Sequence, residues 1–303
     1  MTNPIITLAV VNFFPQRGEM EKNAARIGGY IRAAGRRGAD LVLFPELALT
    51  GYCDEKDTPL AEKMQVKNAC SLEDGPVLAL RRAAEEAGVY ALFGAPEKAG
   101  ETVYNAAFVC CPDGRALTYR KLHPFAEENR WCSPGDSPLL LDTPFGKMGV
   151  GICHDTYSFP ELPRYYAAQG AKLYLNLTAL SSINTWDDFY RTTLQSLVIQ
   201  TGMFVASANL CGSDLSCNFP GGSLVMGPSL GWLMGKEYPY CHVYAGGVGC
   251  FEQEMFLATI DLSRALPGVF AENPATGRPD FRPERYAAWY GELAGNRKEG
   301  AAR

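Results

Sequence analysis

The chain has 303 residues, of which 47% are hydrophobic and 20% are charged, and its formal net charge is −5. This composition is typical of a globular protein, and the negative charge argues against binding to nucleic acid or to an anionic membrane surface. No run of eighteen apolar residues occurs, and the N-terminal residues show no signal-peptide pattern. We therefore expect a cytoplasmic protein without a membrane span.

Apolar strands alternate with amphipathic helices in the first half of the chain. Ile27 and Ile31 mark the apolar face of one helix, whereas the strands are short and either β-branched or continuously apolar. The triplet Pro112-Asp113-Gly114 predicts a tight turn between two strands. The predicted helices span residues 19–37 and 78–87, and the predicted strands span residues 5–12, 39–44, 90–94, 106–111 and 116–121.

The same alternation continues in the second half. Helices are predicted at 162–169 and 186–201, and strands at 147–152, 173–177, 203–208, 222–226, 241–247 and 255–260. From about residue 263 the chain is rich in proline, glycine and charge, which predicts a C-terminal extension with a frayed tail at 295–303. Because no linker divides the chain, we expect a single α/β domain over 1–303, with sheets covered by helices.

The ten cysteines and three histidines give no pattern typical of a metal or redox site. No two cysteines form a Cys-x-x-Cys pair, which disfavours a zinc ribbon and a thioredoxin-type motif. His123, His154 and His242 lack short ligand spacings. A disulfide framework is not expected in a reducing compartment. The sequence predicts free thiols, no metal site and no cofactor.

Cys153 ends a short apolar strand and is followed by the polar residues His154 and Asp155. A cysteine at the tip of a buried strand is rigid yet reachable, as a nucleophile requires, and backbone N–H groups beyond the strand can stabilise an oxyanion. The alternative is that Cys153 is a small buried hydrophobe, like most cysteines of soluble proteins.

Glu46 follows the predicted strand 39–44 and Pro45. A carboxylate is costly to bury unless it is paired or hydrogen-bonded, and burial raises its pKa toward the range useful for a general base. Taken alone, the segment also fits a surface glutamate after a proline turn.

Lys121 ends the predicted strand 116–121, and Glu128 follows it closely. A lysine beside a carboxylate can donate a hydrogen bond to a developing oxyanion or a proton to a leaving amine. The alternative is a solvated lysine, as is usual for basic residues after a hairpin.

Together these segments resemble the nitrilase, or carbon–nitrogen hydrolase, superfamily, from about Ile5 to about Tyr286. The order Glu46, Lys121, Cys153 carries much of the resemblance. Further matches are Phe44-Pro45-Glu46 with Gly51-Tyr52, Ser207-Ala208-Asn209 with Gly212, Gly221-Gly222-Ser223, and the segment 280–286.

By this resemblance, Glu46 corresponds to the general base, Lys121 to the catalytic lysine and Cys153 to the nucleophile. Glu128 resembles the family's second glutamate, which holds the lysine and the substrate in place. The resemblance also implies a four-layer α-β-β-α sandwich, and a homodimer or larger homo-oligomer that associates through a helical face.

The sequence departs from the family pattern at two places. The stretch Leu197–Thr201 lacks an Arg-Ala-x-Glu-Asn pattern that is frequent in the family. The segment from Cys153 to Glu161 is one residue longer than its commonest form, near residues 156–158. We expect this longer segment to reshape the rim of the pocket, and neither departure removes a candidate catalytic group.

Four residues near the motifs are candidates for substrate contacts: Tyr52, Trp131, His154 and Tyr157. The aromatic side chains fit packing as well as they fit a pocket lining. His154 suggests a cysteine–histidine pair, but neighbours at a strand end point in opposite directions. We therefore expect His154 to be a loop residue that touches substrate or Asp155.

The predicted function is hydrolysis of a small linear amide or N-carbamoyl compound through a thioester on Cys153, with release of ammonia or an amine. True nitrilases usually carry Trp-Glu after the nucleophile, and the sequence here is His154-Asp155, which favours an amidase or carbamoylase. Two alternatives stay open. One is a nitrilase that converts a nitrile to acid and ammonia, and the other is a catalytically silent binding or scaffold protein on the same fold.

Overall fold

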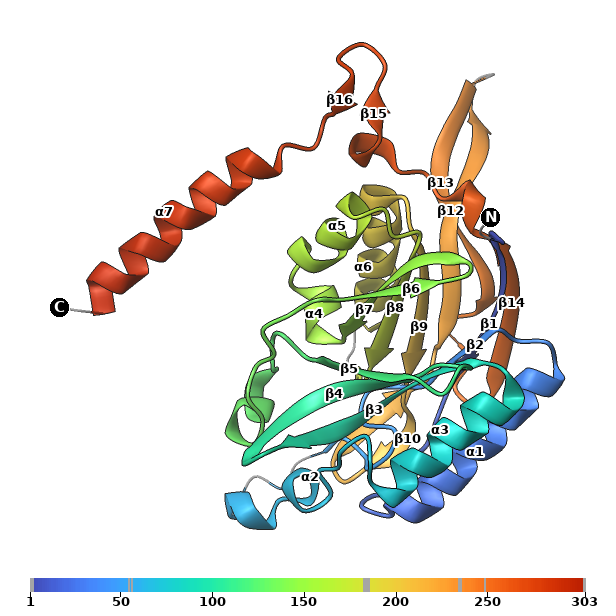
Figure 1. The fold of residues 1–303 in the computed structure, drawn as a ribbon, viewed down its shortest axis with the longest axis vertical. Helices are drawn as coiled ribbons and strands as arrows, with labels where there is room; N and C mark the ends of the chain where they lie inside the picture. Colours follow the sequence, from blue (N-terminus) through green and yellow to red (C-terminus); the bar gives the residue numbers. More distant parts are fainter. Residues whose placement is uncertain are drawn as a thin grey trace. The chain divides into compact units, whose positions relative to one another are not determined.

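Two six-stranded sheets form the main body of the protein, residues Met1–Leu266, in a computed structural model (Figure 1). The structure describes residues 3–53, 55, 57–181, 186–233, 236–247 and 249–301. Each sheet combines parallel and antiparallel strands. Glu46 and Lys121 follow strands of one sheet, and Cys153 follows a strand of the other.

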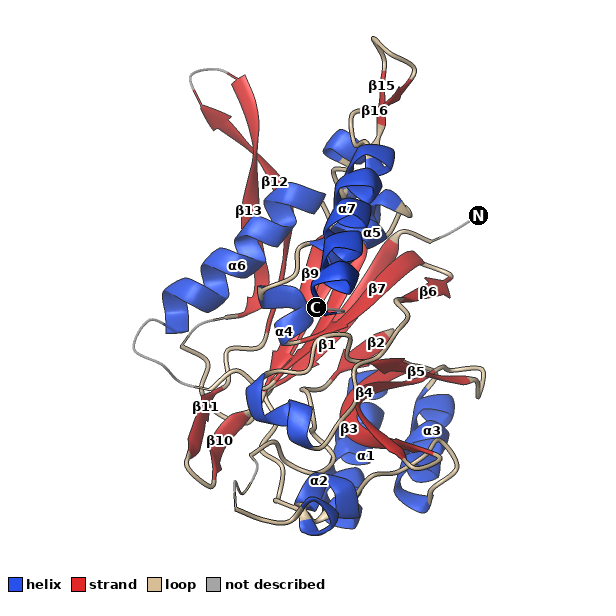
Figure 2. Cartoon of the chain, turned by 90° about the vertical axis from the view of Figure 1, so that its left-hand side faces the viewer, coloured by secondary structure: helices blue, strands red, loops and turns tan. Residues whose placement is uncertain are grey.

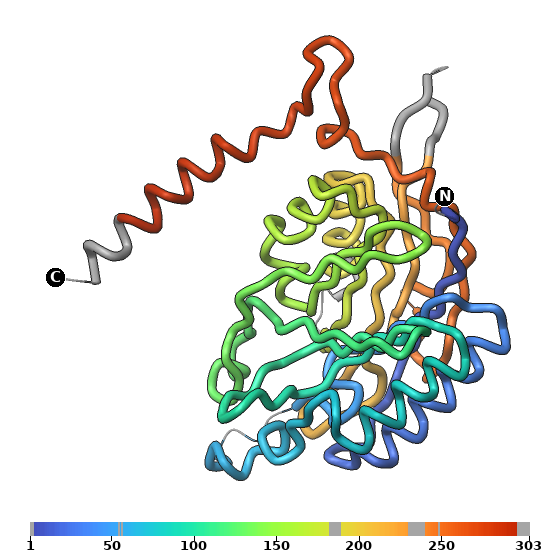
Figure 3. The backbone as a smooth tube through the Cα atoms, viewed as in Figure 1, coloured from blue at the N-terminus to red at the C-terminus, as the bar shows by residue number. Residues whose placement is uncertain are grey.

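The first sheet contains, in spatial order, β14 (Met255–Asp261), β1 (Ile5–Val11), β2 (Leu41–Leu43), β3 (Tyr90–Ala99), β4 (Thr102–Cys110) and β5 (Ala116–Arg120). β1, β2 and β3 are parallel, whereas β14, β4 and β5 join antiparallel. Residues far apart in sequence meet here, because Ile5 pairs with Asp261 and Val11 with Met255 (Figure 3).

The second sheet contains, in spatial order, β13 (Lys236–Gly246), β12 (Leu224–Leu233), β9 (Phe204–Asn209), β8 (Leu173–Thr178), β7 (Gly146–Ile152) and β6 (Leu139–Thr143). β7, β8 and β9 are parallel, and the other pairs are antiparallel. A small hairpin, β10 (Cys211–Asp214) with β11 (Cys217–Pro220), follows β9.

Helices cover the outer faces of both sheets (Figures 1 and 2). α1 (Met20–Arg36) and α3 (Gly75–Ala87) pack on the first sheet, and α5 (Glu161–Ala168) and α6 (Trp186–Thr201) pack on the second. β1 and β2 contact β9, so the inner faces of the two sheets meet. The molecule is therefore a four-layer α-β-β-α sandwich, which confirms the predicted fold class.

The burial of β1 shows why its sequence is almost continuously apolar. Ala9 and Val11 belong to the cluster that packs against α1 and α3, and the alternate residues Leu8 and Val10 are also fully buried. Since successive side chains point to opposite faces, both faces of the strand are covered. A strand in this position has no polar face.

Short helical segments complete the main body. They are η1 (Leu60–Glu62), α2 (Met64–Lys67), η2 (Ala126–Arg130), α4 (His154–Tyr157) and η3 (Leu262–Arg264). Among the described residues, no helix combines the length and apolar character that a membrane crossing needs.

Residues Pro267–Arg303 form a second compact unit. It contains η4 (Gly268–Phe270), the hairpin β15 (Glu272–Asn273) with β16 (Arg278–Pro279), and α7 (Pro283–Ala301). Phe281 packs against Phe270 and Tyr286, with ring centroids 5.0 and 5.5 Å apart. The structure thus shows helix over most of the stretch for which the sequence predicted a frayed tail, and residues 302–303 lie outside the described residues.

Candidate active site

Glu46 lies in a turn that is tied to the neighbouring strand β3. The Gly94 N–H donates to the Pro45 carbonyl at 3.0 Å, and the Leu49 N–H donates to the Gly94 carbonyl at 3.1 Å. Leu47 adopts a φ of 49°, which closes the turn within a few residues. The turn begins shortly after β2, and the strand is therefore three residues long, whereas the sequence predicted six.

The turn approaches β3 so closely that only glycine fits at position 94. A Cβ there would lie 2.2 Å from the Leu47 nitrogen and 2.6 Å from the Glu46 Cα. We expect Gly94→Ala to lower the free energy of unfolding by about 1–3 kcal/mol, because backbone must move, and to lower activity by displacing Glu46. Urea unfolding and turnover check this.

Gly29→Ala is the matched control, because Gly29 is an exposed glycine in α1 and a Cβ there would meet nothing within 4 Å. This change is expected to raise stability by about 0.5–1 kcal/mol. Equal effects of the two substitutions would contradict the steric argument.

Lys121 follows β5, and its side chain is buried between two carboxylates. Its N–H donates to the Asn105 carbonyl at 2.8 Å. Its Nζ donates to Glu46 Oε1 at 2.7 Å and to both Glu128 oxygens at 2.9 Å. The structure therefore brings Glu46, Lys121 and Glu128 together.

Backbone and side-chain donors surround the two carboxylates. Glu46 Oε2 accepts from the Ala179 N–H at 2.9 Å. Glu128 accepts from the Tyr52 hydroxyl at 2.7 Å and from the Phe125 N–H at 3.2 Å. Such donors offset the cost of burying charged oxygens.

Cys153 lies at the end of β7, opposite these groups. Its N–H donates to the Leu177 carbonyl at 2.9 Å, and its φ of 47° turns the chain sharply into α4. A non-glycine residue rarely adopts this conformation, and such strain is frequent at functional sites. Only 8% of the Cys153 surface is exposed.

Asn176 on β8 supports the Cys153 turn, and the sequence analysis did not identify it. Its Oδ1 accepts from the Cys153 N–H at 3.2 Å and from the Thr156 hydroxyl at 2.7 Å. Its Nδ2 donates to Tyr157 and to Ser207. Thr156 and Tyr157, in the segment predicted to be one residue longer, lie in α4 and are held from β8, and Ser158 follows the helix.

Asp155 links the strand that carries Lys121 to the strand that carries Cys153. Its fully buried carboxylate accepts from the Tyr119 hydroxyl at 2.8 Å, from the His123 N–H at 2.9 Å and from the Ile152 N–H at 3.2 Å. The His123 ring nitrogen Nδ1 lies 2.8 Å from the same carboxylate. Hydrogen bonds from both sheets therefore fix the relative positions of Lys121 and Cys153.

For Glu46 and Lys121, burial and the attraction between opposite charges act on the pKa in opposite directions. Burial raises the pKa of Glu46, and the nearby Lys121 only partly offsets this. Burial alone would lower the pKa of Lys121, but Glu46 and Glu128 outweigh it and hold the pKa well above its usual value. Burial, followed by repulsion from Glu46, raises the pKa of the Cys153 thiol. Cys153 is therefore neutral at rest near neutral pH.

Two of the candidate substrate-contacting residues border this cluster. Tyr52 donates to Glu128, and burial raises the pKa of its hydroxyl well above the usual value. The Tyr157 hydroxyl donates to Thr178 Oγ1 at 3.2 Å, and Thr178 also forms a hydrogen bond with the Cys153 thiol.

The other two candidates have different surroundings. Trp131 is 5% exposed, packs with Leu47 and Cys132, and lines a cavity of about 300 Å³. The His154 ring pairs with the Ser158 hydroxyl at 3.1 Å, and burial lowers its pKa. His123, rather than His154, contacts Asp155.

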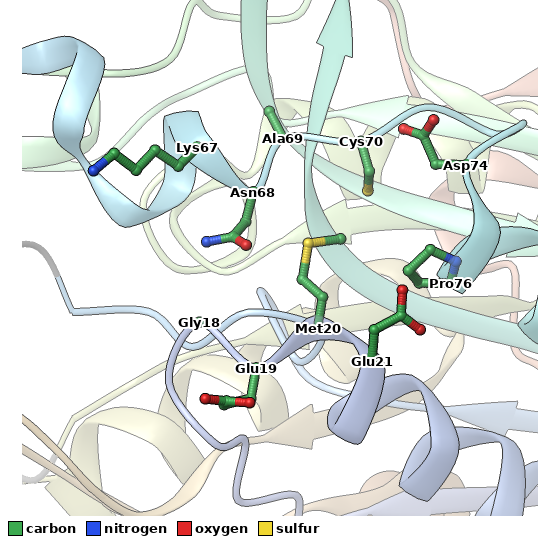
Figure 4. Close-up of a pocket in the computed structure, with 10 residues that line it drawn as sticks. All are labelled: Gly18, Glu19, Met20, Glu21, Lys67, Asn68, Ala69, Cys70, Asp74 and Pro76. Atoms are coloured by element: carbon green, nitrogen blue, oxygen red, sulfur yellow. The ribbon is translucent and has the colours of Figure 1, made fainter.

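Cavities open elsewhere on the molecule. One of about 410 Å³ is lined by residues at the starts of α1 and α3 and at the end of α2, with Met20 at its centre (Figure 4). Its lining includes neither Glu46 nor Cys153. Another of about 330 Å³ lies among α4, α5 and α6, and Tyr157 lines it. Over the described ranges, no group of three His, Cys, Asp or Glu side chains could hold a metal ion.

Known proteins of similar sequence are hydrolases of carbon–nitrogen bonds by name. A nitrilase from Pyrococcus abyssi is 31% identical over 226 residues, which cover 74% of this chain and 82% of that protein. A formamidase from Bacillus cereus is 29% identical over 296 residues, which cover 91% of this chain and 86% of that protein.

Solved structures show the same fold. A mutant of the amidase from Nesterenkonia sp. AN1, which shows covalent addition of the acetamide moiety of fluoroacetamide at the active site cysteine, superposes with a TM-score of 0.73. The match covers 95% of this chain and 97% of that chain, at 23% sequence identity. The family model for carbon-nitrogen hydrolases matches residues 7–235. The chain therefore belongs to the carbon–nitrogen hydrolase family.

Proposed function

We propose that the protein hydrolyses a small linear amide or N-carbamoyl compound through a thioester on Cys153. One observation carries the proposal: the buried Lys121 ammonium lies between the carboxylates of Glu46 and Glu128, and Asp155 joins the Lys121 segment to the Cys153 segment by hydrogen bonds. Two carboxylates on one ammonium leave a net negative charge in the interior, which is costly for stability and typical of acid–base sites.

The first half of the reaction forms the thioester. The Cys153 sulfur attacks the amide carbon while its proton passes to Glu46, whose raised pKa makes it a better base than an ordinary glutamate. The carbonyl electrons move to the oxygen, which Lys121 and the His154 N–H, the first of α4, stabilise. The C–N bond then breaks, and the proton on Glu46 leaves with ammonia or the amine.

The second half regenerates the enzyme. Water gives a proton to Glu46 and attacks the thioester carbon. The C–S bond breaks, the acid leaves, and the proton on Glu46 returns to the Cys153 sulfur. Glu128 holds Lys121 in place through both steps, because both of its oxygens accept from Nζ.

Burial and charge favour a small, neutral substrate. Cys153 is only 8% exposed, and the charged groups that act on it are paired with one another. A charged substrate would have to compete with Glu46 or Glu128 for Lys121. The similarity to a formamidase, and to an amidase with an acetamide moiety on its cysteine, supports this substrate class.

The test is an ammonia-release assay over formamide, acetamide, neutral N-carbamoyl compounds and aliphatic nitriles, joined to intact-mass analysis of quenched enzyme. We expect ammonia from an amide or carbamoyl compound, and an acyl group that peptide mapping assigns to Cys153. Turnover of nitriles alone would make the protein a nitrilase. Ligand binding without turnover or adduct would instead support the silent binding protein.

The fall of kcat/KM at low pH, the acidic limb of its pH profile, reports on the ionisation of Glu46. Activity requires the ionised carboxylate, so it falls as pH falls through the pKa of Glu46. Because burial raises that pKa, we expect the midpoint of the limb to lie above 4.5, the ordinary value. Steady-state rates between pH 4 and 9 measure it, and a profile that stays flat down to pH 4.5 would contradict the assignment.

A further inference from the structure

Asn105 contacts the three charged residues of the site, Lys121 through the backbone and Glu46 and Glu128 through its side chain, and was not singled out by the sequence. It lies on β4 and is fully buried. Its carbonyl accepts from the Lys121 N–H at 2.8 Å. Its Nδ2 donates to Glu46 Oε1 at 2.8 Å and to Glu128 Oε2 at 3.2 Å.

The orientation of the Asn105 amide follows from its neighbours. Carboxylates only accept hydrogen bonds when ionised, so the group that faces both Glu46 and Glu128 must be the NH₂. The opposite flip would place the amide oxygen against two anionic oxygens. The Oδ1 atom is buried and has no hydrogen-bond partner. The two carboxylates therefore account for every hydrogen bond of this side chain.

We propose that Asn105 is a positioning residue whose amide holds Glu46 and Glu128 ionised on either side of Lys121. This inference rests on the proposed function. Glu46, Glu128 and Lys121 together carry a net charge of −1, and one ammonium cannot neutralise both carboxylates. A neutral donor that faces both favours their charged forms without adding charge.

The consequence for catalysis concerns the proton of the Cys153 thiol. Without the Asn105 donor the cluster would take up a proton more readily, and a protonated Glu46 cannot accept the thiol proton. The same hydrogen bond lowers the pKa of Glu46, in opposition to burial. Asn105 acts through Glu46 and Glu128 and needs no contact with the substrate.

Asn105→Asp keeps the shape of the side chain and replaces the amide donor by a third acidic group beside Glu46 and Glu128. Because Oδ1 has no hydrogen-bond partner, the substitution alters only the hydrogen bonds that Nδ2 donates to Glu46 and Glu128. We expect kcat to fall by about tenfold to a hundredfold. We also expect the acidic limb to move upward by about one pH unit, with KM changed less than kcat.

Asn105→Ala removes the donor without adding a carboxylate or a hydroxyl, and it gives the same readouts if the aspartate variant fails to fold. Asn12→Ala is the control, because Asn12 is fully buried and donates to the Cys250 and Glu252 carbonyls rather than to the charged cluster. This control is expected to lower stability and keep the wild-type pH profile. A folded Asn105 variant with the wild-type kcat and acidic limb overturns the proposal.

Alkylation by iodoacetamide separates this inference from the proposed function, because it requires no turnover. The pH dependence of Cys153 modification is followed by peptide mass in wild type and in both Asn105 variants. If no amide is hydrolysed, the proposed function fails. An upward shift of the alkylation profile in the variants still supports the role of Asn105, and an unchanged profile overturns it.

Discussion

Replacing Cys153 by alanine is expected to abolish amide hydrolysis while the protein stays folded. The sulfur is the atom that forms the thioester, and no other group at the site replaces it. Loss of a nucleophile typically lowers kcat by at least about 10⁴-fold. The change removes one buried sulfur and leaves the Cys153 N–H bond to Leu177 in place. Ammonia release and urea unfolding measure the two effects.

Cys110→Ala provides the matched control. Cys110 is also buried, but it lies in β4 and pairs with Ala91 and Ala116 rather than with the charged cluster. We expect this variant to lose some stability and keep its turnover. Residual turnover of Cys153→Ala near the wild-type rate would remove Cys153 from the mechanism.

Lys121→Met is expected to lower the free energy of unfolding by about 3–5 kcal/mol at pH 8, in addition to abolishing activity. Removing one member of a buried ion pair leaves the other charge uncompensated. Glu46 and Glu128 are 0% and 3% exposed, so solvent cannot replace the ammonium. Methionine fills a similar volume, which limits the contribution from a cavity.

The pH dependence distinguishes this electrostatic cost from simple packing loss. Without Lys121, the pKa of Glu46 rises further above its ordinary value, because the ammonium no longer offsets burial. Folding then favours the protonated carboxyl group, so stability is lost as pH rises through the folded pKa. Lys121→Met should therefore be least destabilised near pH 5, and Glu128→Gln added to it should restore part of the stability at pH 8. Equal destabilisation at both pH values would contradict the electrostatic origin.

The residues that could be predicted from the sequence stand at the ends of strands. Glu46 and Cys153 each follow a short apolar run, and the change from apolar to polar residues is visible without a structure. Lys121 instead lies at the end of the second strand of a hairpin that a clear turn signal predicts. The resemblance to a known family then supplied their roles. Glu128 was found only through that resemblance, because a glutamate in a short 3-10 turn has no local signal.

Residues inside elements, and the contacts of side chains near the motifs, could not be predicted. Asn105 lies within β4, where strand periodicity says nothing about a donor that faces two carboxylates. Trp131 is next to a motif in sequence, yet its ring packs beside Leu47. β6 was missed because its leucines follow a proline-rich segment without alternation. These features depend on contacts between distant parts of the chain.

The division of the site between two sheets has a consequence for the newly made protein. Glu46 and Lys121 belong to the first sheet and Cys153 to the second, so neither half alone forms a reactive centre. The first sheet is complete only when β14 returns to pair with β1, with Asp261 opposite Ile5. A ribosome-bound chain that stops short of β14 should therefore show no hydrolysis. During synthesis, activity should appear only after β14 has left the ribosome and paired with β1.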